Sequence, residues 1–159
     1  MGLDAFVFCD CFEKGIIREP PPRQELVFVT ENGSLDCESD DPEILEEFDI
    51  WIRDRACEHE EGILTGFYIG NATLVAELWD ELANEPQKFP ILLSKVLYDG
   101  THCGDFLNKS DIIKLKSELK KLSKFRCRDS EMQEYMQTLE QQMSNLVDCA
   151  LSVGKPIAF

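Results

Sequence analysis

One stretch decides the fold: residues 25–57 read ELVFVTENGSLDCESDDPEILEEFDIWIRDRAC. Its first part holds two strand-like runs, residues 25–30 and 35–37, with Asn32-Gly33 between them. Asn-Gly between two such runs is typical of a β-hairpin, because the turn residues adopt positive φ. The sequence therefore predicts an antiparallel hairpin at about residues 25–37.

The second part of this stretch changes to the spacing of an amphipathic helix. Asp41 is suited to an N-cap, and Pro42 is suited to the first helical position. One apolar stripe with a period near 3.6 follows, which predicts a helix to about Cys57. The stripe is made of Ile44, Leu45, Phe48, Trp51, Ile52 and Ala56.

The flanking sequence extends both patterns. Residues 3–11 indicate a strand, so we expect a small antiparallel sheet over about residues 3–37. Helical patterns cover about residues 41–153, with caps at Asn71, at Ser110 or Asp111, and at Asp129 or Ser130. Residues 63–68 fit either a strand or irregular structure, and residues 156–159 fit a short C-terminal strand. The prediction is one α+β domain over residues 1–159, with four to five helices and a long C-terminal helix.

Charge excludes two classes of partner. The 159 residues contain 16 Lys and Arg against 31 Asp and Glu, a net charge of -15. Nucleic acid and anionic membrane surfaces both require a basic footprint, so neither is expected as a partner. The N-terminus lacks the pattern of a secretion signal. Seven cysteines, an odd number, favour reduced thiols. We therefore expect a cytoplasmic protein.

The acidic residues are concentrated in the first part of the chain. Residues 31–61 hold 13 acids against Arg53 and Arg55. A concentrated negative potential speeds association with a cationic partner, although many charged runs are only solvated surface. The first hypothesis is thus a non-enzymatic interaction module for a protein with a basic surface. Its expected contacts are Asp41, Glu43, Glu46, Glu47, Asp49, Trp51 and Asp54.

Cysteine and histidine residues supply the alternative hypothesis, a small metal-binding protein or enzyme. Thiolate and imidazole are the ligands that zinc prefers, and four of them complete a tetrahedral site. No pair has the Cys-x2-Cys spacing of common zinc motifs, so no cofactor is expected, and zinc is kept only as the alternative. Its candidate ligands are Cys9, Cys11, Cys57, His59 and His102.

Catalytic chemistry would centre on the two histidines of the chain. His59 and His102 both have acidic neighbours and could act as general bases, and Cys103 could act as a nucleophile. This hypothesis requires the two histidine loops to meet in one pocket. The glycine-rich loop at residues 100–105 lacks the Lys-Ser/Thr of a phosphate-binding loop. No other catalytic motif is present, and this favours the non-enzymatic hypothesis.

Six short segments are spread over nearly the whole chain: MGLDA at residues 1–5, CDC at 9–11, PPP at 20–22, ACEHE at 56–60, GTHCGD at 100–105 and GKPIAF at 154–159. Together they resemble a family of small bacterial cytosolic proteins. The resemblance implies no particular activity. The size and acidity of that family are similar to those of immunity proteins that neutralise bacterial toxins, which is an analogy with the first hypothesis. The segments lie mainly in loops and chain ends, which leaves open a site built from Cys9, Cys11, Cys57, His59 and His102.

Overall fold

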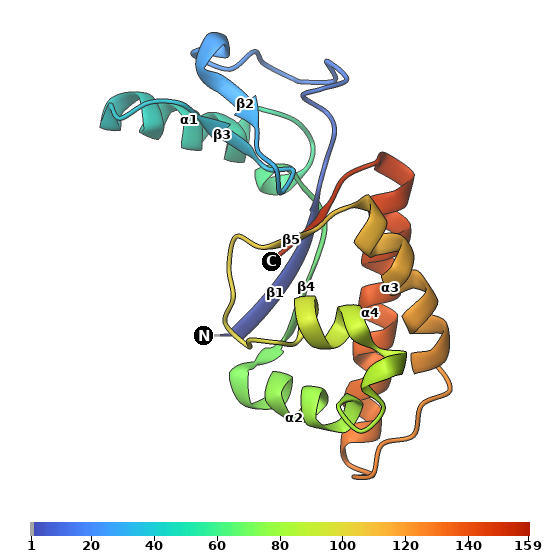
Figure 1. The fold of residues 1–159 in the computed structure, drawn as a ribbon. Coiled ribbons are helices and arrows are strands. Elements are labelled where there is room, and N and C mark those ends of the chain that lie inside the picture. Colours follow the sequence, from blue (N-terminus) through green and yellow to red (C-terminus); the bar gives the residue numbers. More distant parts are fainter. Residues whose placement is uncertain (1) are drawn as a thin grey trace.

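The computed structural model describes residues 2–159 and confirms the α+β class. Figure 1 shows a main body, in which helices pack on a sheet, and a smaller part that extends from one end of that sheet. The sheet is antiparallel and has the strand order β4-β1-β6-β5. Its strands are β1 (Gly2–Phe8), β4 (Ile63–Asn71), β5 (Phe106–Leu107) and β6 (Ile157–Ala158).

The composition of this sheet corrects the predicted small sheet over residues 3–37. β1 pairs with β4 and β6, whereas the hairpin forms a separate two-stranded sheet. β1 ends at Phe8, so Cys9 and Cys11 lie beyond the strand. The ambiguous residues 63–68 belong to β4 because they pair along nearly the whole length of β1. Alternate β1 side chains, those of Leu3, Ala5 and Val7, are fully buried, as a half-covered strand requires.

Helices α2 (Ala72–Leu82), α3 (Lys109–Leu122) and α4 (Met132–Val153) pack with the sheet around the larger core. Asn71 caps α2, as predicted. Asn108, rather than Ser110 or Asp111, caps α3 because its side chain accepts the Asp111 N–H. Within the range predicted to be helical, Leu92–Val96 form a π-helical turn. Short 3₁₀ turns lie at Gln24–Leu26, Glu60–Gly62 and Pro86–Lys88.

The smaller part, residues 12–56, is called the small lobe. It contains the hairpin strands β2 (Val27–Val29) and β3 (Leu35–Cys37) and helix α1 (Pro42–Asp54). The hairpin is confirmed, but residues 30–34 form its loop and only Gly33 has positive φ there. The Asp41 side chain accepts the Glu43 N–H at the start of α1, as predicted. A second core fills this lobe, with Cys37, Phe48, Trp51 and Ala56 buried.

One buried lysine joins the small lobe to the main body. Gly154 ends α4 in the left-handed conformation, with φ 72°. The next residue, Lys155, is 7% exposed. Its Nζ donates to the Gly33 carbonyl at 3.2 Å and lies 2.5 Å from a carboxylate oxygen of Glu13. The C-terminal turn of the main body therefore holds the hairpin loop of the small lobe.

A candidate metal centre at the neck of the small lobe

The candidate site lies where the chain leaves the main sheet and returns to it. These two stretches, residues 9–11 and 57–62, are called the neck. The last pair in the β1–β4 ladder is Phe8 with Ile63. Immediately beyond it, Cys9 donates its backbone N–H to the Gly62 carbonyl at 2.7 Å. Residues 9–62 are therefore one long excursion between two neighbouring antiparallel strands. Cys9 and Cys11 lie at its start, and Cys57 and His59 lie at its end.

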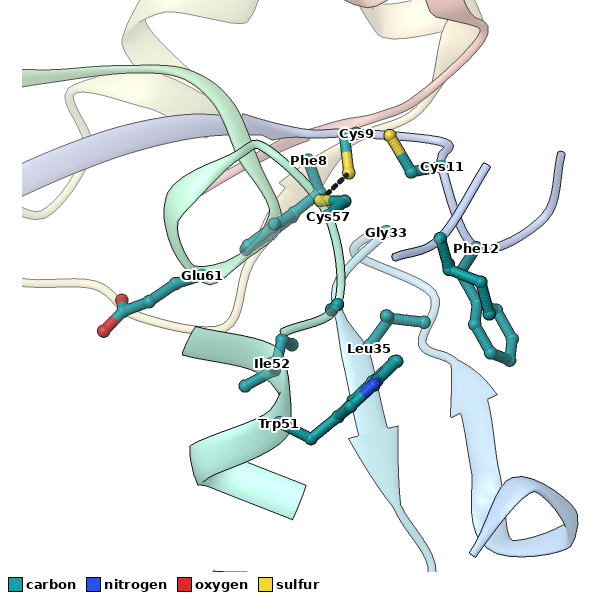
Figure 2. A pocket seen from close by; sticks show the side chains of 13 residues that line it. Phe8, Cys9, Cys11, Phe12, Gly33, Leu35, Trp51, Ile52, Cys57 and Glu61 are labelled. Atoms are coloured by element: carbon teal, nitrogen blue, oxygen red, sulfur yellow. Dashed lines mark hydrogen bonds between the residues drawn. The ribbon is translucent and has the colours of Figure 1, made fainter. Parts of the chain in front are cut away.

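These four side chains converge. One ligand atom from each of Cys9, Cys11, Cys57 and His59 lies within 4.8 Å of the ligand atoms of the other three. The Sγ atoms of Cys9 and Cys57 are 3.8 Å apart, and Figure 2 shows them pointing toward one another. The Nδ1 atom of His59 lies 3.5 Å from the Cys11 sulfur and 3.6 Å from the Cys57 sulfur. Four of the five predicted metal candidates are thus brought together.

The separations match those of a tetrahedral zinc site. Zinc–sulfur bonds of about 2.3 Å and zinc–nitrogen bonds of about 2.05 Å place two sulfurs about 3.8 Å apart and a sulfur and a nitrogen about 3.5 Å apart. The measured contacts between Cys9 and Cys57, and between His59 and its two cysteine neighbours, have these lengths. A divalent ion could therefore bind without a large movement of these side chains.

The loop that carries His59 has an unusual backbone. Glu61 has φ 51° and ψ 23°, and it is the only non-glycine residue with positive φ among residues 2–159. Gly62 follows with φ 71°. Such a conformation costs free energy in a residue with a side chain, and it persists where the surrounding structure requires it. Here it allows the chain to turn from His59 into β4 while the Gly62 carbonyl meets Cys9.

Burial makes two of the three thiols, those of Cys9 and Cys11, poorer acids. It raises the pKa of the Cys9 thiol to about 12, and hydrogen bonding and charge at Cys11 and Cys57 act on the same thiol. Burial also raises the pKa of Cys11. Three thiolates close together repel one another unless a cation is present. A dication would offset that repulsion, and its binding would release protons.

A small cavity adjoins the sulfurs. Its volume is about 20 Å³, which is room for roughly one water molecule. All three cysteines line it, together with Gly62 and apolar side chains of the small lobe such as Trp51 (Figure 2). Little enclosed space therefore lies beside the sulfurs. A set of four protein ligands is typical of structural zinc rather than catalytic zinc.

His102, the fifth metal candidate, does not belong to this group. Its ring is packed between the rings of Tyr98 and Phe159, at centroid distances of 4.7 and 4.9 Å. The Nε2–H donates to the Val96 carbonyl at 2.9 Å, and Nδ1 lies 3.3 Å from a carboxylate oxygen of Asp105. These contacts hold the loop before β5 in place. The neighbouring Cys103 is exposed and makes no side-chain hydrogen bond within residues 2–159.

The predicted partner-binding residues divide into two kinds. The acidic ones lie exposed on or at the start of α1: Asp41, Glu43, Glu46, Glu47, Asp49 and Asp54. Trp51 is only 2% exposed, which corrects the expectation that it contacts a partner. Its ring packs against Phe12 and Phe48, and its Nε1–H donates to the Glu19 carbonyl at 2.8 Å. Trp51 belongs to the apolar stripe that forms the core of the small lobe.

Two supporting residues were not predicted from the sequence. Glu61 and Lys155 shape the neck, one through its backbone and the other through its ammonium group. Neither has a periodic sequence signal, although Glu61 directly follows the ACEHE segment and Lys155 lies within the GKPIAF segment of the resemblance.

Comparisons with known proteins found no similarity. No protein-family model, no curated protein and no solved structure matches the chain. Within residues 2–159, no helix has the length and apolar composition needed to cross a bilayer. The function must therefore be argued from the residues themselves.

Proposed function

We propose that this protein binds one zinc ion through Cys9, Cys11, Cys57 and His59, and that the ion fixes the small lobe to the main sheet. The observation that carries the proposal is the convergence of three sulfurs and one imidazole nitrogen within 4.8 Å. Soft sulfur and nitrogen ligands favour zinc over magnesium or calcium, which bind oxygen. The proposal also implies a reducing compartment such as the cytoplasm, in which thiols remain available as ligands.

The position of the four ligands explains why an ion would be useful. The small lobe has a modest core, with four buried apolar residues against the much larger core of the main body. Its two ends are joined by backbone hydrogen bonds from Arg18 to Ala56 and from Glu19 to Arg55, and they lead directly into the neck. An ion that binds Cys9 and Cys11 together with Cys57 and His59 would crosslink the start of residues 9–62 to their end. Metal binding of this kind contributes directly to folding free energy.

Metal content of the purified full-length chain tests the proposal. We expect one zinc per chain by inductively coupled plasma mass spectrometry. Substitution by Co²⁺ should produce the visible absorption of tetrahedral cobalt with thiolate ligands. Cys57→Ser should abolish both signals. The matched control is Cys149→Ser, which alters another half-buried cysteine that packs against the larger core. Zinc content that is far below one, or unchanged in Cys57→Ser, would contradict the proposal.

We also propose, as a second function, that α1 docks onto a basic protein surface. The specific observation is that Glu43, Glu46, Glu47 and Asp49 are exposed and form no ion pair with any residue in the described range 2–159. Unpaired charge of one sign on a projecting helix favours steering of a cationic partner. A basic protein captured at low salt should be lost when Glu46, Glu47 and Asp49 are changed to Lys. Capture that is insensitive to this change would contradict the second function.

A further inference from the structure

We propose that Cys9 and Cys57 form a reversible disulfide when a peroxide oxidises the centre, and that this reaction releases the zinc ion. The inference rests on the proposed zinc site and assigns its regulation. The observation behind it is the 3.8 Å contact between the Sγ atoms of Cys9 and Cys57, which point toward one another. A disulfide bond is about 2.05 Å long, so the sulfurs must approach by less than 2 Å.

The reaction balances with hydrogen peroxide as the oxidant. Zinc holds its cysteine ligands as thiolates, which are the nucleophilic form of the side chain. One thiolate of the pair attacks the peroxide, the O–O bond breaks, and a sulfenic acid and a hydroxide ion result. The second thiolate then attacks the sulfenic sulfur, forms the S–S bond and expels another hydroxide. Two electrons pass from the two sulfurs to the two peroxide oxygens.

Loss of two ligands explains why the ion leaves. Only Cys11 and His59 would remain, whereas structural zinc sites use four protein ligands. The three sulfurs offer two other pairs, Cys9 with Cys11 and Cys11 with Cys57. We assign the Cys9–Cys57 pair because its two sulfurs lie 3.8 Å apart and point toward one another. Cys9 and Cys57 lie 48 positions apart and face each other across the neck.

The oxidised neck would still be closed. A Cys9–Cys57 disulfide joins the start of the excursion to its end, as the ion does. A crosslink over such a long loop restricts the unfolded chain and stabilises the fold. Oxidation would therefore free His59 and Cys11 without detaching the small lobe. The centre would act as a switch between an ion-bound and an ion-free neck, with the fold preserved in both.

The test uses the full-length, zinc-loaded chain. Zinc content is measured first, and one equivalent of hydrogen peroxide is then added. Released zinc is followed with a chromogenic chelator, and the linked peptides are mapped by mass spectrometry without reduction. We expect one zinc released per Cys9–Cys57 disulfide, and recovery of zinc binding after reduction. Cys103→Ser, which removes an exposed cysteine outside the site, should behave like the wild type.

The outcomes separate the two proposals. Failure to bind zinc before oxidation contradicts the zinc site and, with it, the switch. Stoichiometric zinc that stays bound after peroxide, or that leaves without a Cys9–Cys57 crosslink, overturns the switch alone.

Discussion

Cys9 donates its backbone N–H to the carbonyl of Gly62 at 2.7 Å, one step beyond the last pair of the β1–β4 ladder. This bond brings the two ends of a long excursion together at the edge of the main sheet. The side chains at these two ends, those of Cys9, Cys11, Cys57 and His59, are the four that could hold a metal ion. The pairing of two strands thus creates the site, and the small lobe is held by the same few residues that would bind the ion.

The two histidines should respond differently to substitution. His59→Ala removes a nitrogen that lies 3.5 and 3.6 Å from two of the sulfurs. We expect zinc affinity to fall by more than the roughly 10–100-fold loss seen for residues that only orient a ligand. His102→Ala should leave zinc affinity unchanged. It should lower the free energy of unfolding by roughly 2–4 kcal/mol, because it opens a cavity and leaves the Val96 carbonyl unpaired.

Zinc competition titration and urea unfolding measure the two effects. Equal losses of zinc affinity in the two variants would contradict the conclusion that only His59 belongs to the metal site. That outcome would also restore the hypothesis that both histidine loops form one site.

Lys155 should contribute to stability through the small lobe. Lys155→Met keeps the apolar part of the side chain and removes the ammonium group that contacts Glu13 and the Gly33 carbonyl. Breaking a buried pair costs about 3–5 kcal/mol, but Glu13 is partly exposed, so we expect a loss of roughly 1–3 kcal/mol. Urea unfolding followed by Trp51 fluorescence, in a Trp79→Phe background that removes the tryptophan of α2, reports on this lobe directly, since Trp51 lies in its core.

The control for this prediction is another lysine in an ion pair. Lys116→Met removes an exposed contact with Asp148, and exposed pairs contribute about 0–1 kcal/mol. A loss in Lys155→Met that is no larger than the loss in Lys116→Met would show that Lys155 does not hold the lobes together.

Local features of the fold were predictable because they depend on nearby residues. The apolar stripe of α1, its Asp41 cap and the left-handed Gly154 all follow from short-range spacing and backbone preferences. The hairpin was predicted for the same reason. Its loop differs from the expected one because the Asn32 side chain accepts hydrogen bonds from Thr30 and Ser34 and stabilises a longer turn.

The candidate metal centre could not be predicted from the spacing of residues along the sequence. Cys9-x-Cys11 and Cys57-x-His59 are two incomplete ligand pairs, and only the pairing of β1 with β4 places them together. Residues 63–68 fit more than one structure because they are apolar but do not alternate strictly. His102 resembled a ligand in sequence because it has acidic neighbours. Its partner proved to be the Val96 carbonyl, which no side-chain pattern reveals.

Glu118 should make stability depend on pH. Its side chain is buried, with the residue 3% exposed, and accepts the backbone N–H groups of Ile91 and Leu92. Burial raises the pKa of this carboxyl above its usual 4.5, although those two hydrogen bonds act in the opposite direction. The folded chain therefore favours the protonated form. Its contribution is fully present below pH 4.5 and is lost as pH rises through the raised pKa.

Glu118→Gln removes this titration. The advantage of the wild type over the variant, measured by urea unfolding at several pH values, should decrease as pH rises from about 4 toward 7. Gln also has one acceptor for two N–H donors, so the variant should remain less stable by about 1–3 kcal/mol near pH 4.5. Glu134→Gln, at an exposed position on α4, should show neither effect. A difference that does not vary with pH would contradict this account of Glu118.

Glu61 supplies the last prediction, because its left-handed backbone separates conformation from side-chain chemistry. Its φ of 51° suits glycine. Glu61→Gly should therefore be at least as stable as the wild type, because the relief of backbone strain offsets the greater conformational freedom of the unfolded chain. Glu61→Val places a β-branched residue in the same conformation and should cost roughly 1–2 kcal/mol. Zinc affinity should follow the same order, since this turn leads from His59 into β4. Urea unfolding and zinc titration of the two variants check the order of stability and of zinc affinity. A Glu61→Gly variant that loses zinc while Glu61→Val retains it would show that zinc binding depends on the Glu61 backbone in a way opposite to the one expected.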